Sequence, residues 1–232
     1  MIPNILSIAG SDPSGGAGIQ ADIKAISANG GYAMAAITAL TAQNTQGVQA
    51  VQMVAPDFVA QQIAALRADI RIDAVKIGML GSAEMVNTVR LALDGLDVPV
   101  VLDPVMVAKG GDRLLQADAV AALRAALSMA SVITPNLPEA ADLLGQAEAD
   151  TRDQMESQAQ ALLALGPKAV LLKGGHLPGR DCPDLLATAD GQTWLPGPRH
   201  DTRRTHGTGC TLSSALATLL GRKQALPQAC IG

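Results

Sequence analysis

The chain has 232 residues, of which 48% are apolar and 16% charged, a composition that supports a buried core and differs from that of disordered chains. The net charge of −4 provides no excess of cations for binding nucleic-acid phosphates. Aromatic residues make up 1% of the chain, too few for base stacking or for an aromatic belt at a membrane. We therefore expect one globular domain over residues 1–232 that binds neither nucleic acid nor membrane.

The cysteines and the N-terminal segment point to a cytoplasmic protein. Three cysteines, at positions 182, 210 and 230, form no C-x-x-C pair, which argues against a disulfide framework and against a zinc knuckle. The opening segment MIPNILSIAG has no basic region before a long apolar run, and no uninterrupted apolar run reaches the roughly 18 residues of a membrane span. Neither export nor membrane spanning is expected.

From the N-terminus, short aliphatic runs alternate with longer amphipathic stretches. The first half predicts, in order, a strand at 4–9, a helix at 17–29, a strand at 33–40, a helix at 56–69, a strand at 74–77, a helix at 82–93 with Ser82 as N-cap, and a strand at 98–103. The second half predicts a helix near 117–127, a strand at 131–134, helices at 137–144 and 153–165, a strand at 169–173, a hairpin of strands 185–188 and 193–195, and a helix at 207–220. This alternation predicts an α/β fold whose mostly parallel central sheet is covered by helices on both faces.

In such sheets ligands bind at the carboxyl ends of the strands, so the segments that follow strands are the candidate site. The first of them, GSDPSGGAG at 10–18, has glycines that permit close backbone approach and polar groups on Asp12 and Ser14. A plain glycine-rich turn before a helix would explain it as well. The segment is no Walker A loop, because no G-x-x-x-x-G-K-[ST] pattern occurs in the chain.

Two further segments place carboxylates at strand ends. In DPVMVAKGGD at 103–112, Asp103 ends a strand and Lys109 adds a cation before two glycines, which suits a flap over phosphates, although Asp103 could equally be a turn or cap residue. In TPNLPEA at 134–140, Asn136 and Glu139 stand three apart at a helix start. An N-cap followed by an acid in the first turn would explain this second pair equally well.

The segment THGTGCTLSSA at 205–215 is the most informative. Two glycines flank Thr208 directly before a helix, so successive amides can point at an anion with the helix dipole behind them. The same position should lower the pKa of Cys210 by favouring its thiolate, although most lone cysteines are buried and inert. His206 more often only stabilises such a loop, and we assign it no chemistry.

Taken together and in order, seven segments of the chain resemble the hydroxymethylpyrimidine/phosphomethylpyrimidine kinase family of thiamine biosynthesis. They are GSDPSGGAGIQAD (10–22), ITALTAQNT (37–45), KIGML (76–80), VVLDPVMVAKGGD (100–112), TPNLPEA (134–140), KGGH (173–176) and THGTGCTLSSA (205–215). The family belongs to the ribokinase-like superfamily. The resemblance therefore implies a three-layer α/β/α sandwich with a mostly parallel central sheet and an active site along the carboxyl edge of that sheet.

The resemblance also implies the reaction and the cofactors. Members use ATP and Mg²⁺ to phosphorylate 4-amino-5-hydroxymethyl-2-methylpyrimidine and then its monophosphate. Carried over by motif, the catalytic group would be the amides of Gly207, Thr208 and Gly209 with Cys210 as the base. The substrate-binding group would be Gln43, Gly10, Asp22, Val105 and Met106. Asn136 and Glu139 would order Mg²⁺, and Asp103, Lys109 and Lys173 would lie at the nucleotide phosphates.

Three further expectations come from the resemblance. Members usually continue beyond the position that matches Gly232, so a C-terminal helix region that contributes to the nucleotide pocket is expected to be missing from this chain. A homodimer is expected. The alternative activity is that of a pyridoxine/pyridoxal kinase of the same superfamily, and a non-catalytic pyrimidine-binding module is the alternative from another class. Gln43 within TAQN favours the pyrimidine, and the retained phosphate-binding segments favour an enzyme.

Overall fold

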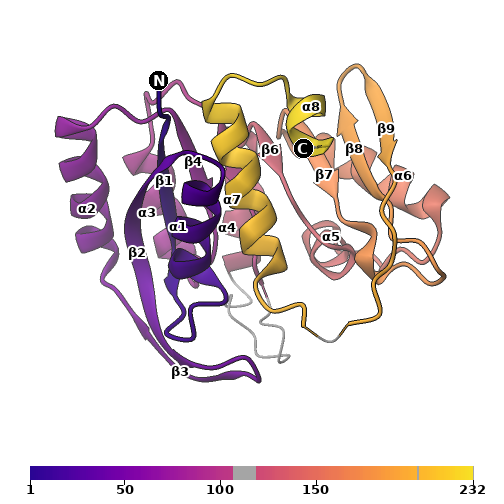
Figure 1. Ribbon diagram of the computed structural model, residues 1–232, viewed down its shortest axis with the longest axis horizontal. Helices are drawn as coiled ribbons and strands as arrows, with labels where there is room; N and C mark the ends of the chain where they lie inside the picture. Colours follow the sequence, from indigo (N-terminus) through magenta and orange to yellow (C-terminus); the bar gives the residue numbers. More distant parts are fainter. Residues whose placement is uncertain (107–118, 203, 232) are drawn as a thin grey trace.

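The computed structural model describes residues 1–106, 119–202 and 204–231 (Figure 1). Its strands form one sheet and are β1 (Asn4–Ser11), β2 (Tyr32–Gln43), β3 (Val48–Met53), β4 (Ala74–Ile77), β5 (Val100–Leu102), β6 (Val132–Ile133), β7 (Ala169–Leu172), β8 (Asp184–Thr188) and β9 (Gly191–Leu195). Its helices are α1 (Gly18–Ala28), α2 (Pro56–Asp69), α3 (Ala83–Ala92), α4 (Ala119–Ala126), α5 (Leu137–Leu144), α6 (Arg152–Leu163), α7 (Thr208–Gly221) and α8 (Leu226–Ile231), with short 3-10 turns at Leu127–Met129 and Gly174–His176.

The sheet is parallel in its centre and antiparallel at both edges. Its strand order is β3-β2-β1-β4-β5-β6-β7-β8-β9, and the pairs from β2 through β7 are parallel. Strand β3 pairs antiparallel with β2, and the β8–β9 hairpin continues antiparallel from β7. The predicted mostly parallel α/β fold and the predicted hairpin are confirmed.

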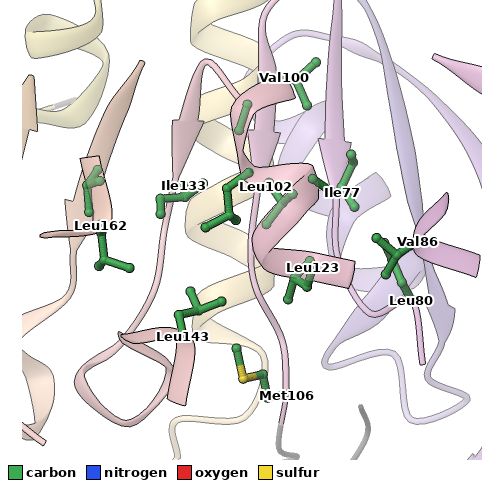
Figure 2. Close-up of a cluster of buried hydrophobic side chains, with 14 of the residues drawn as sticks. Ile77, Leu80, Val86, Val100, Leu102, Met106, Leu123, Ile133, Leu143 and Leu162 are labelled. Carbon is green, nitrogen blue, oxygen red and sulfur yellow. The ribbon is translucent and has the colours of Figure 1, made fainter. Parts of the chain in front are cut away.

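Two helical layers cover the sheet. Helices α1, α7 and α8 pack on one face around Ile5, Ile26 and Leu216, and in Figure 1 α7 crosses in front of the central strands. Helices α2 to α6 contribute to a larger apolar cluster on the other face, part of which is drawn in Figure 2. Successive strand residues alternate between the layers: Val101 belongs to the first cluster, whereas Val100 and Leu102 belong to the second. The three-layer sandwich implied by the resemblance is therefore present.

The carboxyl ends of the parallel strands lie at one edge of the sheet, the lower edge in Figure 1, where α7 also begins. The central strands β1, β4, β5, β6 and β7 are buried along most of their length, since both faces are covered. Polar residues that directly follow these strands are therefore collected at one edge, which is where a ligand site can form.

The predicted bounds agree with the structure for several helices and strands, whereas two short elements, β3 and α8, are absent from the prediction. Strand β4 and helices α2 and α5 have the predicted bounds, and Ser82 caps α3 by accepting a hydrogen bond from the Met85 amide. Strand β3 was not predicted, because VQAVQM lies on the sheet edge, is largely exposed and shows no clear alternation. Helix α8 was not predicted either, because it has six residues and Pro227 at its second position. The first two residues of the helix expected near 117–127 lie outside the described residues.

Candidate active site

The start of α7 is an uncapped helix N-terminus made of glycine-rich backbone. Gly207 is the N-cap, has a left-handed backbone with φ 75°, and supplies no side-chain cap. A Cβ on Gly207 would lie 1.7 Å from the carbonyl oxygen of Gly16, so only glycine fits where the two loops meet. The first amides of α7 have no partners within the helix, as at any helix N-terminus, and can donate to an anion.

Two charged side chains stand beside this start. A Cβ on Gly209 would lie 3.3 Å from Lys173 Nζ and 3.3 Å from Asp103 Oδ2. Lys173 Nζ lies 3.3 Å from Asp103 Oδ1, which also accepts a 3.0 Å hydrogen bond from the Thr134 hydroxyl. The ends of β5, β6 and β7 thus meet the start of α7, and the structure brings together the predicted residues Asp103, Lys173 and Gly209.

Lys173 keeps its positive charge in this cluster. Burial acts to lower the pKa of Lys173, but Asp103 and Glu139 outweigh it and the net pKa is raised. An ammonium group therefore stands next to the α7 amides at neutral pH. Amides and ammonium are the donors that a phosphate oxygen accepts from.

Asn136 and Glu139 form a reciprocal capping box at the start of α5. The Glu139 amide donates to Asn136 Oδ1 at 2.8 Å, and the Asn136 amide donates to Glu139 Oε2 at 2.8 Å. Burial raises the pKa of Glu139 to about 7, helped by Asp103 and Asp142 and opposed by Lys173 and the Asn136 amide. The capping interpretation is confirmed. A cation near Glu139 would stabilise the charge of this buried carboxylate, which the nearby Asp103 disfavours.

No group of three or more His, Cys, Asp or Glu side chains among residues 1–106, 119–202 and 204–231 could hold a metal ion by itself. Mg²⁺ keeps several waters and is commonly held by one or two carboxylates together with phosphates, and the carboxylate of Glu139, which bonds the Asn136 amide, is of the right chemistry for such a ligand.

Cys210 has a raised pKa, so the predicted lowering is wrong. Burial is the largest cause, and the carboxylates of Asp22 and Asp103 add to it, while Lys76 and a hydrogen bond from the Gly18 amide act in the opposite direction. The sequence placed Cys210 at a helix N-terminus correctly, but it did not indicate the burial or the two acids. The thiol is mainly protonated at neutral pH in the ligand-free protein.

On the substrate side, Gln43 lies at the end of β2 and is partly exposed. The Thr41 hydroxyl joins it to β1: it donates to the Ser11 carbonyl at 2.8 Å and lies 3.1 Å from Gln43 Oε1. Gly10 precedes Ser11, and a Cβ there would lie 3.3 Å from Met79 Sδ. The structure therefore brings Gln43 and Gly10 to the same end of the sheet.

Two of the predicted substrate-binding side chains are buried. Asp22 is fully buried, and its carboxylate accepts hydrogen bonds from Ser7, Lys76 and Ser214. Met106 is 1% exposed and packs in the core cluster of Figure 2, whereas Val105 is partly exposed. The assignments of Asp22, Val105 and Met106 to the substrate-binding group stay predictions. Lys109 lies outside the described residues.

The sequence analysis missed two structural features that bear on function, the Asp12–His206 pair and the buried Lys76. Asp12 and His206 pair across the two glycine-rich loops at 2.8 Å, although the sequence suggested no chemistry for His206. Lys76 is fully buried in strand β4 beside Asp22. The signal for Lys76 was a lysine within an aliphatic strand, because such a charge must find a buried partner.

A cavity of about 400 Å³ adjoins the start of α7. Thr208 and His206 border it at the loop, Leu212 and Leu216 along α7, and Asp184 and Cys230 on the far side. Its walls are mostly apolar and include the loop that precedes α7 and the first turn of that helix. A flat heterocycle would fit the apolar part while attached phosphates reach the amides.

The fold is that of a ribokinase-like α/β protein, with an uncapped, glycine-rich helix start at the carboxyl edge of its sheet. The phosphomethylpyrimidine kinase family matches residues 12–231, and the chain belongs to that family. It is 54% identical over 221 residues to the hydroxymethylpyrimidine/phosphomethylpyrimidine kinase of Escherichia coli. The aligned region covers 94% of this chain and 83% of that protein. The family's enzymes are phosphotransferases.

Two solved structures are similar over nearly the whole chain. The phosphomethylpyrimidine kinase of Clostridium difficile has a TM-score of 0.87 and 40% identity, covering 98% of this chain and 94% of that chain. An ADP complex of Bacillus subtilis pyridoxal kinase has a TM-score of 0.91 and 36% identity, covering 99% and 88%. Within the part of the chain that the structure describes, no helix is long and apolar enough to cross a bilayer.

Proposed function

We propose that the protein transfers a phosphoryl group from ATP to the hydroxymethyl group of 4-amino-5-hydroxymethyl-2-methylpyrimidine, and a second one to the resulting monophosphate. The observation that carries this proposal is the uncapped start of α7 beside the Lys173 ammonium, at the carboxyl edge of a ribokinase-like sheet. Family membership supports the substrate class, since the E. coli relative bears the name of this activity. Phosphoryl transfer needs positioning and charge stabilisation above all, and both are available at this edge.

The residues have distinct roles in the proposed reaction. The amides from Gly207 to Gly209, including that of Thr208, hold oxygens of the transferring group, and Lys173 neutralises their charge. The Cys210 thiolate accepts the proton of the substrate hydroxyl as that oxygen bonds to the γ-phosphorus, while the bond to the β-phosphate oxygen breaks and ADP leaves. Asp103 holds Lys173 in place through their 3.3 Å contact.

ATP is the phosphoryl donor, in keeping with the family and with the ADP complex of the Bacillus subtilis relative. Mg²⁺ belongs to the proposal. Glu139 and Asn136 would hold the ion through its waters, and the ion would supply charge neutralisation at the phosphates. The cavity beside α7 is the proposed site of the nucleotide base.

Gln43 is the proposed specificity residue, because its amide can both donate to and accept from the amino-pyrimidine edge. Gly10 and Val105 would border the ring. Gly10 is suited to this place because any side chain there would crowd Met79.

Pyridoxal phosphorylation is a second candidate, favoured by the likeness to the Bacillus subtilis pyridoxal kinase. Both substrates are flat heterocycles that carry a hydroxymethyl group. The higher identity to the E. coli pyrimidine kinase, 54% against 36%, favours the pyrimidine.

We also propose that the protein is a single domain, forms a homodimer and is located in the cytoplasm. One continuous sheet supports the single domain. Exposed apolar side chains at the β2–β3 edge, Leu40 at 52% and Val51 at 42%, support an interface between two copies. The three cysteines are free thiols, which suits a reducing compartment.

A coupled assay of ADP release tests the proposal with three separate acceptors: the pyrimidine, its monophosphate and pyridoxal. We expect turnover with the first two and slower turnover with pyridoxal. Turnover with pyridoxal alone would replace the proposed function by the second candidate, and binding of the pyrimidine without ADP release would indicate the non-catalytic module.

A further inference from the structure

Asp12 and His206 join the two glycine-rich loops of the site. His206 Nε2 donates to Asp12 Oδ2 across 2.8 Å, and the two residues are 194 positions apart in the chain. The exposed fractions of their side chains are 14% for His206 and 2% for Asp12, so the contact is shielded from water. A charge-assisted hydrogen bond in such a place is stronger than one on the surface.

Asp12 also organises its own loop. Its carboxylate accepts hydrogen bonds from the Ser14 amide, the Ser14 hydroxyl and the Ala17 amide at 2.8 to 2.9 Å. Burial alone would raise the pKa of Asp12, but His206 and these donors outweigh it and the pKa is lowered. The carboxylate is therefore ionised and fixed before any ligand binds.

The backbone contact beside the pair leaves little freedom. A Cβ on Gly16 would lie 2.5 Å from His206 Cδ2, and a Cβ on Gly207 would lie 1.7 Å from the Gly16 carbonyl oxygen. His206 immediately precedes the N-cap Gly207. The imidazole therefore lies directly at the place where the N-terminal loop and the start of α7 meet.

The pair bridges the two halves of the proposed site. The segment 10–18 leads from Gly10, at the pyrimidine side, into α1, whose first amide, that of Gly18, donates to Cys210. The segment 205–210 carries the amides for the phosphoryl group. Alignment of the attacking hydroxyl with the γ-phosphorus depends on the relative position of these two loops, and small misplacements of reacting groups cost much rate.

We propose that Asp12 and His206 form a positioning pair that holds the start of α7 against the N-terminal loop and so aligns the acceptor hydroxyl with the transferring phosphoryl group. The inference rests on the proposed function for its kinetic consequence. His206 touches no reacting atom in this proposal and takes no proton from substrate.

The kinetic test compares His206→Ala, Asp12→Ala, the double variant and the conservative His206→Gln, with His200→Ala as the control because His200 is an exposed histidine of the same connecting segment. We expect kcat with the pyrimidine to fall about ten-fold in each single alanine variant, as for loss of a charge-assisted hydrogen bond, with little change in either KM. The double variant should be no slower than the slower single variant, because each single change already removes the Asp12–His206 contact and only Asp12→Ala also removes the bonds to Ser14 and Ala17. His206→Gln, which keeps a donor, should recover part of the rate, and the control should match wild type.

A second readout does not depend on activity. Amide hydrogen exchange in a peptide that spans residues 205–212 should be faster in His206→Ala than in wild type and unchanged in His200→Ala. If wild type fails to phosphorylate the pyrimidine, the proposed function fails while this measurement still decides on the pair. Unchanged exchange, multiplicative losses in the double variant, or a raised KM for ATP with normal kcat would each overturn the proposal, the last because it would make His206 a nucleotide ligand.

Discussion

Cys210 is the base of the proposed reaction, and its environment opposes the ionisation of its thiol. Burial and two nearby carboxylates raise the pKa of its thiol, while Lys76 and the Gly18 amide favour the thiolate. A base with a raised pKa is a stronger proton acceptor but is less often in its basic form at neutral pH. The two proposed reactions should respond differently to this compromise, because only one of them needs a base.

Replacing Cys210 by Ala should therefore separate the two reactions. An alcohol must lose its proton as it attacks, whereas a phosphate monoester, with a second pKa near 6, is already largely a dianion. We expect Cys210→Ala to slow the reaction of the pyrimidine by about 10²–10⁴-fold, the range for loss of a general base, and to slow the reaction of the monophosphate much less. ADP release with each acceptor measures both rates. Equal losses would mean that Cys210 shapes the anion site instead of taking a proton.

The raised pKa of Cys210 also predicts a pH dependence. The thiolate fraction increases as the pH rises from neutral into the alkaline range, so kcat/KM with the pyrimidine should rise over that range. The rise should disappear in Cys210→Ala and be absent for the monophosphate in wild type. A flat profile for the pyrimidine, measured at saturating ATP, would contradict the assignment of Cys210 as the base.

Gln43 should decide affinity for the pyrimidine and leave ATP binding intact. Removing its amide leaves polar edges of a buried heterocycle unpaired, at a cost of about 1–3 kcal/mol. Calorimetric titration of Gln43→Ala should show weaker pyrimidine binding with unchanged nucleotide binding. Gln46→Ala is the matched control, because Gln46 is exposed on the same β2–β3 connection. Equal pyrimidine affinity in the Gln43 variant and the control would remove Gln43 from the site.

At the scale of elements, α5 shows how a local cap and a ligand site can share residues. The capping box needs an acceptor at position 139, and a glutamine supplies one as well as a glutamate does. The charge of Glu139 is therefore surplus to the cap, and its burial beside Asp103 raises its pKa. This surplus charge is what a metal role requires.

Glu139→Gln should consequently raise the Mg²⁺ concentration for half-maximal rate while leaving the helix intact. Titrating Mg²⁺ at fixed ATP measures the first effect, and the thermal midpoint of unfolding checks the second. Because the amide still accepts the Asn136 N–H, we expect only a small change in stability. An unchanged Mg²⁺ dependence would mean that Glu139 serves the cap alone.

The bounds of β4 and α5 were predicted correctly because the local sequence of each one marks where it begins and ends. Strand β4 is a short aliphatic run, and α5 opens with Asn136, Pro138 and Glu139 in cap positions. Strand β3 carries no such signal, because its side chains face solvent and its place is fixed by pairing with β2. Local pattern cannot report pairing between distant segments.

The site was predictable in its loops and not in its contacts. The glycine pattern predicted the exposed amides at the start of α7, and the strand end predicted the place of Asp103, whereas Lys173 came from the family resemblance. The direction of the Cys210 pKa shift was not predictable, because it depends on the approach of Asp22 and Asp103 from other elements. The inward orientation of Asp22 likewise depends on Lys76, which lies 54 positions away.

At the scale of the whole molecule, the buried ion pair between Lys76 and Asp22 connects the sheet to the helical layer of α1 and α7. Ser7 on β1 and Lys76 on β4 are partners in the sheet register, and both reach Asp22 of α1. Asp22 also accepts a 2.8 Å hydrogen bond from Ser214, one helical turn after Cys210. Burial acts to lower the pKa of Lys76, but Asp22 outweighs it and the net pKa is raised, so Lys76 stays charged.

Breaking this pair should cost far more than breaking a surface pair. Lys76→Met leaves the carboxylate of Asp22 buried and uncompensated, and loss of one partner from a buried pair typically costs about 3–5 kcal/mol of unfolding free energy. Urea unfolding measures this loss. Arg71→Ala is the control, because Arg71 pairs with Asp73 at 2.8 Å on the surface just before β4, where little stability is at stake.

The double variant Lys76→Met/Asp22→Leu shows how much of the Lys76→Met loss comes from the charge left unpaired on Asp22. Since it removes both charges, it should regain part of the stability lost in Lys76→Met, and the two single losses should sum to more than the loss in the double variant. It leaves Ser214 without its acceptor, however, so α7 should remain less firmly held and kcat should stay below that of wild type even where folding is restored. A double variant with the summed losses of its parents would mean that Lys76 and Asp22 act independently, and one with full kcat would mean that the start of α7 does not depend on this anchor.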